Sequence, residues 1–357
     1  MGRISSRQLS EQSFPGTFHC LPIMKTQFAT LLLLAVSSSL LSAHPWTGRR
    51  PDGHAPISVM GDHTHAKGGW MASYRYMTMD MDGLRSGSSD VSTGSQLGMM
   101  KYGMVPTKMT MDMHMFGVMR AVSDKLTLVG MAHYLENDMD MKMMSGMTNS
   151  AKSNGFGDFK ITGLYSLASK HEGSRIHLNL GLSLPTGTID EKDDGQILGY
   201  PMQLGSGTWD LLPGITYLGQ TEHYSWGAQA SGILRIGENN RNYTLGDGFS
   251  VATWGARKLT DSVSVSARLK GENIGNVDGE DAAIATRRLG MDSPTFNPNS
   301  RGREVVSVGL GLNYFFRGEQ LKGHRFALEW ETPLKEDFDG VQLKVDSIWA
   351  LGWQYAW

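Results

Sequence analysis

The sequence predicts an all-β protein: a transmembrane, antiparallel up-and-down β-barrel of about 12 strands with short periplasmic turns and long external loops. Three observations predict this fold. Apolar and polar residues alternate with a period of two, which is the period of a strand. Residues 349–357 place tryptophan and tyrosine on one face and small or polar residues on the other. After the N-terminal leader, no apolar stretch reaches the roughly 20 residues of a membrane-spanning helix.

Residues 1–43 are expected to be an upstream extension followed by a signal peptide. A short apolar run, 28–36, follows a lysine and precedes small residues that end at Ala43. This order is typical of a secretory signal with its cleavage site. Cleavage after Ala43 would make His44 the first residue of the mature chain. It would also remove Cys20, the single cysteine of the sequence, so that the exported protein has neither a thiol nor a disulfide.

The remaining chain divides into a short lead and one barrel. Residues 44–68 contain three prolines and the polar run MGDHTHAKGG, which favour an irregular, histidine-containing periplasmic lead or plug. Residues 69–357 are expected to form the outer-membrane barrel. Twelve segments of this region alternate in the manner of strands: 69–82, 108–122, 126–139, 156–168, 175–185, 207–219, 224–236, 247–259, 262–274, 303–316, 323–333 and 343–357.

The connections between these segments alternate in length. Residues 123–125 and 260–261 make short turns, whereas 83–107, 186–206 and 275–302 are long, polar and rich in glycine. Short periplasmic turns and long external loops are the rule in outer-membrane barrels. With both termini in the periplasm, the three long loops all fall on the outside, which supports the barrel independently of the C-terminal strand.

Methionine alternates with polar residues in three tracts: MTMDMDG (Met77–Gly83), MTMDMHM (Met109–Met115) and DMDMKMM (Asp138–Met144). In the first strand, Arg75 shares a face with the methionines, and aromatic residues occupy the other face. An arginine on the lipid face near the middle of the membrane costs about 2–4 kcal/mol. We therefore expect Arg75 and the methionines to point into the lumen. A lipid-facing stripe of methionine, or a β-bulge that switches the faces, is the alternative.

The lumen residues expected to line a transport pathway combine thioethers with a cation and an imidazole. They are Arg75, Met77, Met79, Met81, Met113, Met115, Met131 and His133. Thioethers are flexible and make favourable contacts with aromatic rings. The sequence therefore favours an outer-membrane channel or transporter that performs no chemistry. The expected solute is a small molecule of aromatic or amphipathic type.

The alternative function is soft-metal handling, in which methionine and histidine bind or transport copper in the outer membrane. Thioethers are ligands for Cu(I), and imidazoles suit Cu(II), zinc or nickel. The candidate imidazoles are His44, His54, His63 and His65, all of which precede the first strand. Histidines in a flexible leader are also common without a metal. The channel hypothesis, which assigns no chemistry to the protein, requires no cofactor.

Composition and motifs also limit which binding partners and activities we expect. The net charge of −2 offers no basic excess for nucleic acid. No G-x-S-x-G context supports a serine hydrolase, so we do not expect an enzyme. The acidic stretches 190–195 and 276–281 fit solvated external loops better than an EF-hand. The expected partners are outer-membrane lipid, lipopolysaccharide, the solute and the assembly machinery, which would read the C-terminal strand ending at Trp357.

Five stretches carry a resemblance to a known family: GDHTHAKGGWMASYRYMTMDMDG, VPTKMTMDMHM, LNLGLSLPTGTID, PMQLGSGTWDLLPGITY and LGWQYAW. From residue 57 to residue 357, the chain resembles outer-membrane transporter-like proteins associated with the MetA pathway of phenol degradation. The resemblance implies a β-barrel in the bacterial outer membrane and a role in moving small, aromatic compounds. It carries no functional residues over to this sequence.

Overall fold

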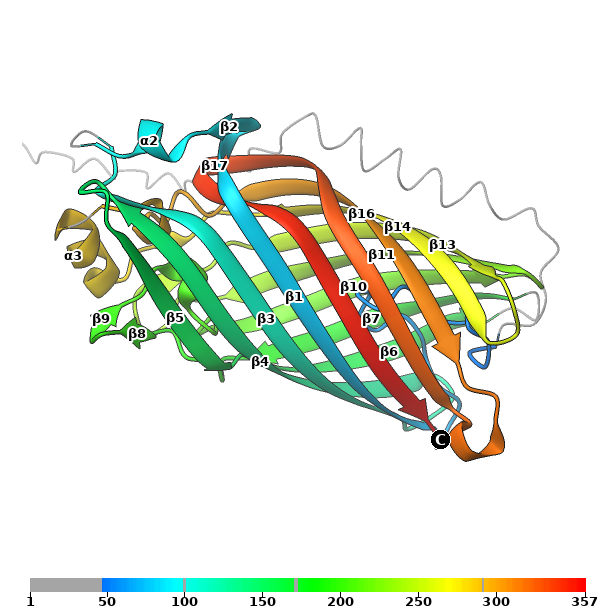
Figure 1. The fold of residues 1–357 in the computed structure, drawn as a ribbon. Helices are drawn as coiled ribbons and strands as arrows, with labels where there is room; N and C mark the ends of the chain where they lie inside the picture. Colours follow the sequence, from blue (N-terminus) through cyan, green and yellow to red (C-terminus); the bar gives the residue numbers. More distant parts are fainter. Residues whose placement is uncertain (1–46, 99–100, 170–172, 291) are drawn as a thin grey trace, which may run out of the picture.

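The structure is a computed structural model that describes residues 47–98, 101–169, 173–290 and 292–357. Its strands form one closed antiparallel barrel. Figure 1 shows that the strands are tilted relative to the long axis of the barrel. The all-β barrel predicted from the sequence is thus confirmed. The expected signal peptide, including Ala43, and His44 lie outside the described residues.

The ring is built from eleven strands, each paired antiparallel with the next in the chain, and the last strand pairs with the first. They are β1 (Trp70–Gly87), β3 (Met104–Ala121), β4 (Leu126–Met143), β6 (Phe159–Ser169), β7 (Ser174–Leu184), β10 (Trp209–Gln220), β11 (Tyr224–Ile236), β13 (Gly248–Lys258), β14 (Val263–Ile274), β16 (Arg303–Phe315) and β17 (His324–Ala356).

The last strand of the ring is a hairpin of two arms. Residues 325–338 of β17 pair with β16, and residues 338–356 pair with β1. The chain turns back near Gly340, which has φ +69°, a conformation that glycine adopts without strain. The two arms touch, since Trp353 Nε1 donates to His324 Nδ1 at 3.0 Å. Counting both arms, the described chain crosses the membrane with the twelve segments that the alternation predicts.

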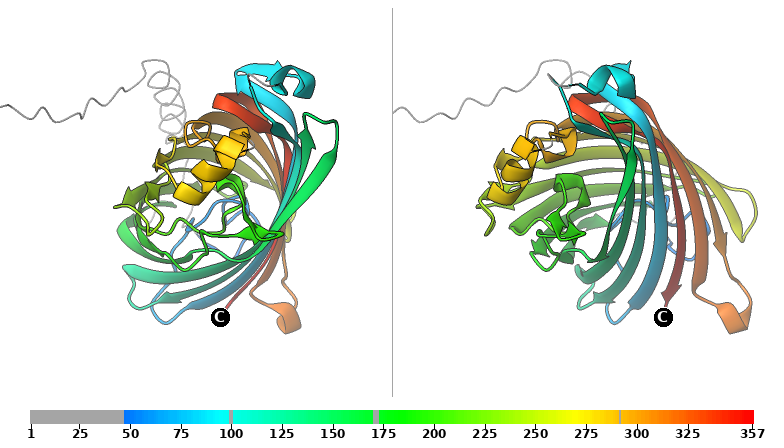
Figure 2. Two further views of the ribbon diagram at one scale, coloured as in Figure 1. Left: turned by 90° about the vertical axis from the view of Figure 1, so that its left-hand side faces the viewer. Right: turned by 60° about the vertical axis from the view of Figure 1, so that its left-hand side comes forward.

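The connections differ at the two ends of the barrel. Apart from the η3 loop (Glu319–Leu321), the described turns at the end that holds Trp70 and Trp357 are short. Trp70 and Trp357 exchange backbone hydrogen bonds of 2.9 and 3.0 Å there. The opposite end carries the longer loops, which Figure 2 shows gathered at one mouth of the ring. By the rule for this class, the short-turn end is periplasmic and the long-loop end external.

Short elements lie within the long-loop end. β5 (Thr148–Phe156) extends the pairing of β4, and β2 (Ser89–Val91) folds back on β1. The other loop elements are α2 (Thr93–Gln96), β8 (Lys192–Asp193), β9 (Gln196–Ile197), η1 (Tyr200–Met202), β12 (Tyr243–Thr244), β15 (Asp278–Gly279), α3 (Ala282–Gly290) and η2 (Pro294–Phe296). Among the helices of the described ranges, none is long and apolar enough to cross a membrane.

The two faces of the barrel wall differ as the sequence pattern predicts. Outward side chains such as Leu180, Leu182 and Leu310 are exposed, at 59%, 42% and 53%. Their inward neighbours along the strands, such as Asn179 and Ser183, are buried. An apolar outer band with a polar interior is the arrangement that a lipid bilayer stabilises.

Replacing an outward residue by arginine should destabilise the barrel only within the membrane band. We expect Leu180→Arg to lower the free energy of unfolding by about 2–4 kcal/mol, measured by urea titration in lipid vesicles. Leu289→Arg is the matched control, because Leu289 is 88% exposed on α3 among the external loops. Equal stability of Leu180→Arg and wild type would contradict the assignment of the lipid face.

Candidate functional site

The segment 47–68 lies inside the barrel at the short-turn end, where Figure 2 shows it in blue within the ring of strands. Inward side chains of several strands hold its backbone. Asn179 Nδ2 donates to the carbonyl of Gly61 at 2.9 Å, and Gln229 Nε2 donates to that of Met60 at 2.9 Å. We call residues 47–68 the N-terminal segment.

Charged side chains of the barrel wall also contact the N-terminal segment. Arg268 forms ion pairs with Glu329 and Glu331 at 2.7 and 2.6 Å, and all three side chains are nearly fully buried. The other carboxylate oxygen of Glu329 accepts from the backbone N–H of Ser58 at 2.9 Å. Arg325 donates to the carbonyl of Ala55 at 3.0 Å. A buried charge is stable only when it is paired and hydrogen-bonded, and these contacts meet that condition.

Arg75 faces the lumen, as its sequence position predicts. Its Nη1 lies 2.7 Å from the sulfur of Met60 in the N-terminal segment. It stands beside Gly352 of β17, where an added Cβ would lie 2.5 Å from Cγ1 of Ile57. Glycine at this position lets the N-terminal segment approach the wall closely.

The tract methionines share the inner face with Arg75. Met77, Met79 and Met81 alternate with it on β1, and Met113 and Met115 face them on β3, opposite Met77 and Arg75. On the outer face, Tyr76 donates to Asp112 at 2.7 Å, and His114 lies 2.8 Å from the hydroxyl of Tyr74. The aspartates of the tracts therefore point out of the barrel and the sulfurs point in, except at Met144, which is exposed beyond the end of β4.

The inward methionines near the external end pack against the loops. Met109, Met139 and Met141 are buried in one cluster with Tyr200 and Phe296. The other buried members are Met104, Ala151, Ile189, Ile197, Leu198, Met202, Tyr243, Val277 and Ile284, and Met81 and Met111 pack against them. The long loops thus fold into the mouth of the barrel and rest on a sulfur-rich surface. We call this cluster the external cap.

A luminal cavity of about 190 Å³ lies between the wall and the 185–208 loop. It is lined by His133, Asp158, Lys160, Ser183, Gln203, Leu204, Gly205, Ser206, Asp210, Leu212, Ile233, Arg235 and Leu245. Of the predicted pathway residues, His133 lines this cavity, whereas Met131 packs below it against Leu164. Asp210 pairs with Arg235, while Lys160 has no ion-pair partner within 4 Å among the residues described.

The alternation of the sequence indicates which polar residues of this cavity point inward, although only His133 was among the predicted pathway residues. Lys160 alternates with Phe159 and Ile161 in the predicted strand 156–168, so its inward direction follows from the period. The period does not predict which residues of other strands lie opposite Lys160 across the lumen.

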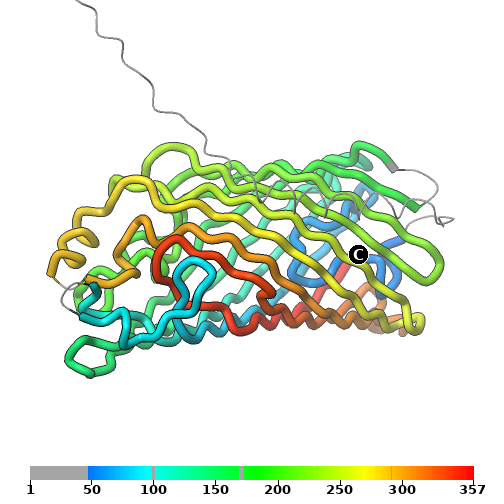
Figure 3. The backbone as a smooth tube through the Cα atoms, turned by 90° about the horizontal axis from the view of Figure 1, so that it is seen from above, coloured from blue at the N-terminus to red at the C-terminus, as the bar shows by residue number. Residues whose placement is uncertain are grey.

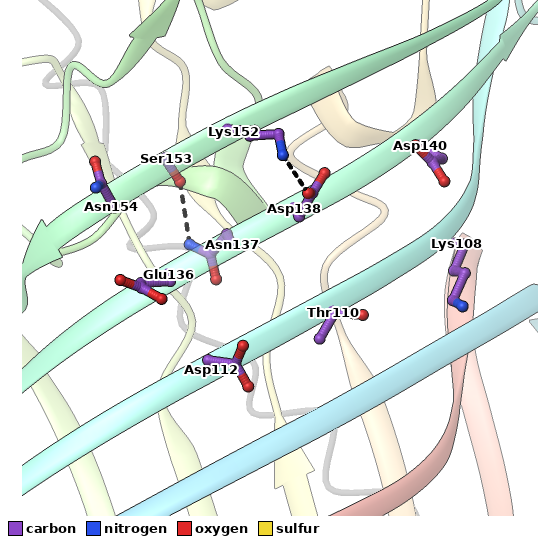
Figure 4. Close-up of a pocket in the computed structure, with 10 residues that line it drawn as sticks. All are labelled: Lys108, Thr110, Asp112, Glu136, Asn137, Asp138, Asp140, Lys152, Ser153 and Asn154. Atoms are coloured by element: carbon purple, nitrogen blue, oxygen red, sulfur yellow. Dashed lines mark hydrogen bonds and ion pairs between the residues drawn. The ribbon is translucent and has the colours of Figure 1, made fainter.

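A larger hollow of about 550 Å³ lies at the external ends of β3, β4 and β5, and Figure 4 shows its lining. It includes Asp112, Glu136, Asp138 and Asp140, with Lys152 paired to Asp138 at 2.6 Å. The acidic groups belong to the outer face of the tracts. This hollow is therefore open to the outside of the barrel and not part of the luminal pathway.

Three of the four histidines proposed from the sequence come together in the N-terminal segment. His54 Nδ1 lies 3.3 Å from His63 Nδ1, and the ring of His65 lies 4.8 Å from that of His63. Asp62, which the sequence reasoning missed, completes the group, with Oδ1 2.8 Å from His63 Nδ1. The adjacent letters D-H-T-H were the available signal.

The pKa values of His54, His65 and Asp62 are all lowered in this group. Burial, together with the neighbouring His63, lowers the pKa of His54 well below its usual value. Burial likewise lowers the pKa of His65 to about 3. Burial acts to raise the pKa of Asp62, but the charge of His63 and its hydrogen bond outweigh this, and the pKa is lowered. These shifts favour neutral imidazoles at His54 and His65 beside an ionised carboxylate at Asp62.

Comparisons with solved structures support the fold. An outer membrane channel from Pseudomonas putida F1 is 13% identical, with a TM-score of 0.59 over 84% of this chain and 100% of that one. A FadL homologue from Pseudomonas aeruginosa is 10% identical, with a TM-score of 0.40 over 88% and 98% of the two chains. A KdgM porin is 9% identical, with a TM-score of 0.39 over 80% and 98%. At such identities the first likeness shows the fold alone.

Comparison with sequences identifies the family. No curated protein matches the chain. A family model described as "Putative MetA-pathway of phenol degradation" matches residues 112–327, which is more than half of the chain. With its closed barrel of the outer-membrane type, this protein belongs to that family.

Proposed function

We propose that this protein is a passive outer-membrane channel for small solutes that combine an aromatic or other apolar body with an anionic group. The luminal cavity carries the proposal. It joins the ammonium group of Lys160, which lacks an ion-pair partner in the described structure, to Leu204, Leu212 and Ile233. At about 190 Å³ it is smaller than the roughly 300–1,000 Å³ of a drug-sized ligand site, so only a small solute fits.

Two further features support an aromatic solute. The inner face of the wall is rich in methionine where the external cap rests on it, and thioethers make favourable contacts with aromatic rings, so opening of the cap would expose them to a solute. The family description, phenol degradation, associates its members with aromatic compounds. The solute would cross unchanged, since the proposal assigns no catalytic role to any side chain.

In this proposal the N-terminal segment acts as a plug at the periplasmic end and the external cap as the opposite gate. Residues 1–43 would be absent from the mature protein after export. The barrel would sit in the lipid and lipopolysaccharide of the outer membrane, delivered by the assembly machinery that reads the strand ending at Trp357.

Copper handling by methionine and histidine together is less well supported. It requires thioethers and imidazoles within reach of one ion. Met81, Met109 and Met139 pack in the external cap, whereas His54 and His63 lie in the N-terminal segment at the opposite end. The solute channel therefore ranks first.

The solute preference is tested by uptake into liposomes that contain the mature protein. Benzenesulfonate, phenyltrimethylammonium and methanesulfonate are permanently charged, so they do not cross lipid unaided. We expect benzenesulfonate to enter fastest. Lys160→Met should slow its entry roughly tenfold, the effect of losing one charge-assisted hydrogen bond, and leave the cation unchanged. Lys125→Met, on an exposed periplasmic turn, is the control. Equal entry of the three solutes would contradict the proposal.

The plug is tested through Arg325, which holds the carbonyl of Ala55. Arg325→Met should loosen the N-terminal segment and speed tryptic cleavage after Arg49 roughly tenfold, as expected when a hydrogen bond to a charged group is lost. Mass spectrometry of the released peptide measures the rate, and heat-modifiable mobility in gels verifies that the barrel is folded. Arg317→Met, on an exposed turn, is the control. Unchanged cleavage in a folded Arg325→Met barrel would argue against an anchored plug.

A further inference from the structure

The His54–Asp62–His63 group has more hydrogen-bond acceptors than it has protons to donate to them. His63 Nδ1 lies 2.8 Å from Asp62 Oδ1 and 3.3 Å from His54 Nδ1. An imidazole nitrogen carries either one proton or one lone pair, so His63 Nδ1 can make a full hydrogen bond to only one of these neighbours. His63 Nε2 and His65 Nε2 are buried and have no hydrogen-bond partner among the described residues. Buried polar atoms of this kind call for a specific explanation.

A cation at the centre of the group removes this conflict. The ligand atoms of His54, Asp62 and His63 all lie within 4.8 Å of one another. In a tetrahedral site with bonds of about 2.0–2.1 Å to nitrogen, two ligand nitrogens are about 3.3 Å apart, which matches the separation of the two Nδ1 atoms. The backbone N–H of Ala55 donates to Asp62 Oδ2 at 2.9 Å and orients the carboxylate, as outer contacts do in metal sites.

We propose that His54, Asp62 and His63 bind one divalent transition-metal ion of the Zn²⁺ or Cu²⁺ class. Two imidazole nitrogens and a carboxylate oxygen suit these ions, whereas Cu(I) prefers soft sulfur ligands. His65 places a third imidazole next to the pair.

The position of the ion gives it a mechanical role, which rests on the proposed channel function. The ion joins His54 to residues 62–63 and so closes the loop 55–61. That loop carries the contacts with the wall, from Ala55 with Arg325 to Gly61 with Asn179. A ligand that binds only the closed form stabilises it by mass action. Metal binding would therefore latch the plug and restrict the channel.

Binding is tested on the detergent-purified mature protein by calorimetric titration with Zn²⁺ and with Cu²⁺. We expect one ion per chain, with affinity at least tenfold weaker in His54→Ala and in His63→Ala. His223→Ala is the matched control, because His223 lies on an exposed turn of the periplasmic end and should leave the affinity unchanged. Absence of binding to the wild type, or an equal loss in all three variants, would overturn the site.

The latch is tested separately from transport by tryptic cleavage after Arg49. Zn²⁺ should slow cleavage at least tenfold in the wild type and in His223→Ala but not in His54→Ala. If Zn²⁺ binds but cleavage does not change, the latch is wrong. Liposome uptake of benzenesulfonate decides the channel function by itself: failed uptake with intact metal protection would overturn the channel and leave the metal site standing.

Discussion

Closure of the barrel is the constraint on which the rest of the structure depends. Hydrocarbon offers no partner to a backbone N–H or C=O group, so an open sheet edge cannot lie in a bilayer. Here the pairing of β1 with the second arm of β17, from Met71–Ala356 to Ser86–Val341, removes the edge. That pairing holds both ends of the barrel sequence at one rim. The N-terminal segment consequently enters the lumen from this rim, and the long loops gather at the other.

Closure also explains the methionine tracts. Once a strand is fixed in a closed wall, its period of two assigns every residue to the lumen or to the outside. Asp80 and Asp112 on the outer face cannot sit in hydrocarbon, so this part of the wall must rise above the lipid. The inner face of the same stretch is then free to pack against loops. Methionine suits that task, since its flexible side chain fits irregular surfaces.

The sequence predicts the wall well because alternation is a local property. It located all twelve crossing segments, and the cost of a lipid-facing arginine was enough to turn Arg75 and the methionines inward. It did not predict contacts across the lumen. Gly61 meets His177 and Asn179, more than a hundred positions away, through hydrogen bonds that no local pattern encodes. For the same reason Asp62 and Lys160 emerged only from the three-dimensional arrangement.

The external cap and the N-terminal segment, which both fill part of the lumen, are held in place by different contacts. The external cap is an apolar cluster, and opening it would expose buried methionine and aromatic surface to water. The N-terminal segment is held by hydrogen bonds to polar wall residues such as Gln229 and Arg325, and also by Ala55, Ile57 and Val59, which are buried against apolar wall residues. Each such bond stabilises the closed form by only about 0.5–3 kcal/mol, because water replaces it when it breaks. A metal ion shared by His54 and His63 would add a cross-link at a single point to these contacts.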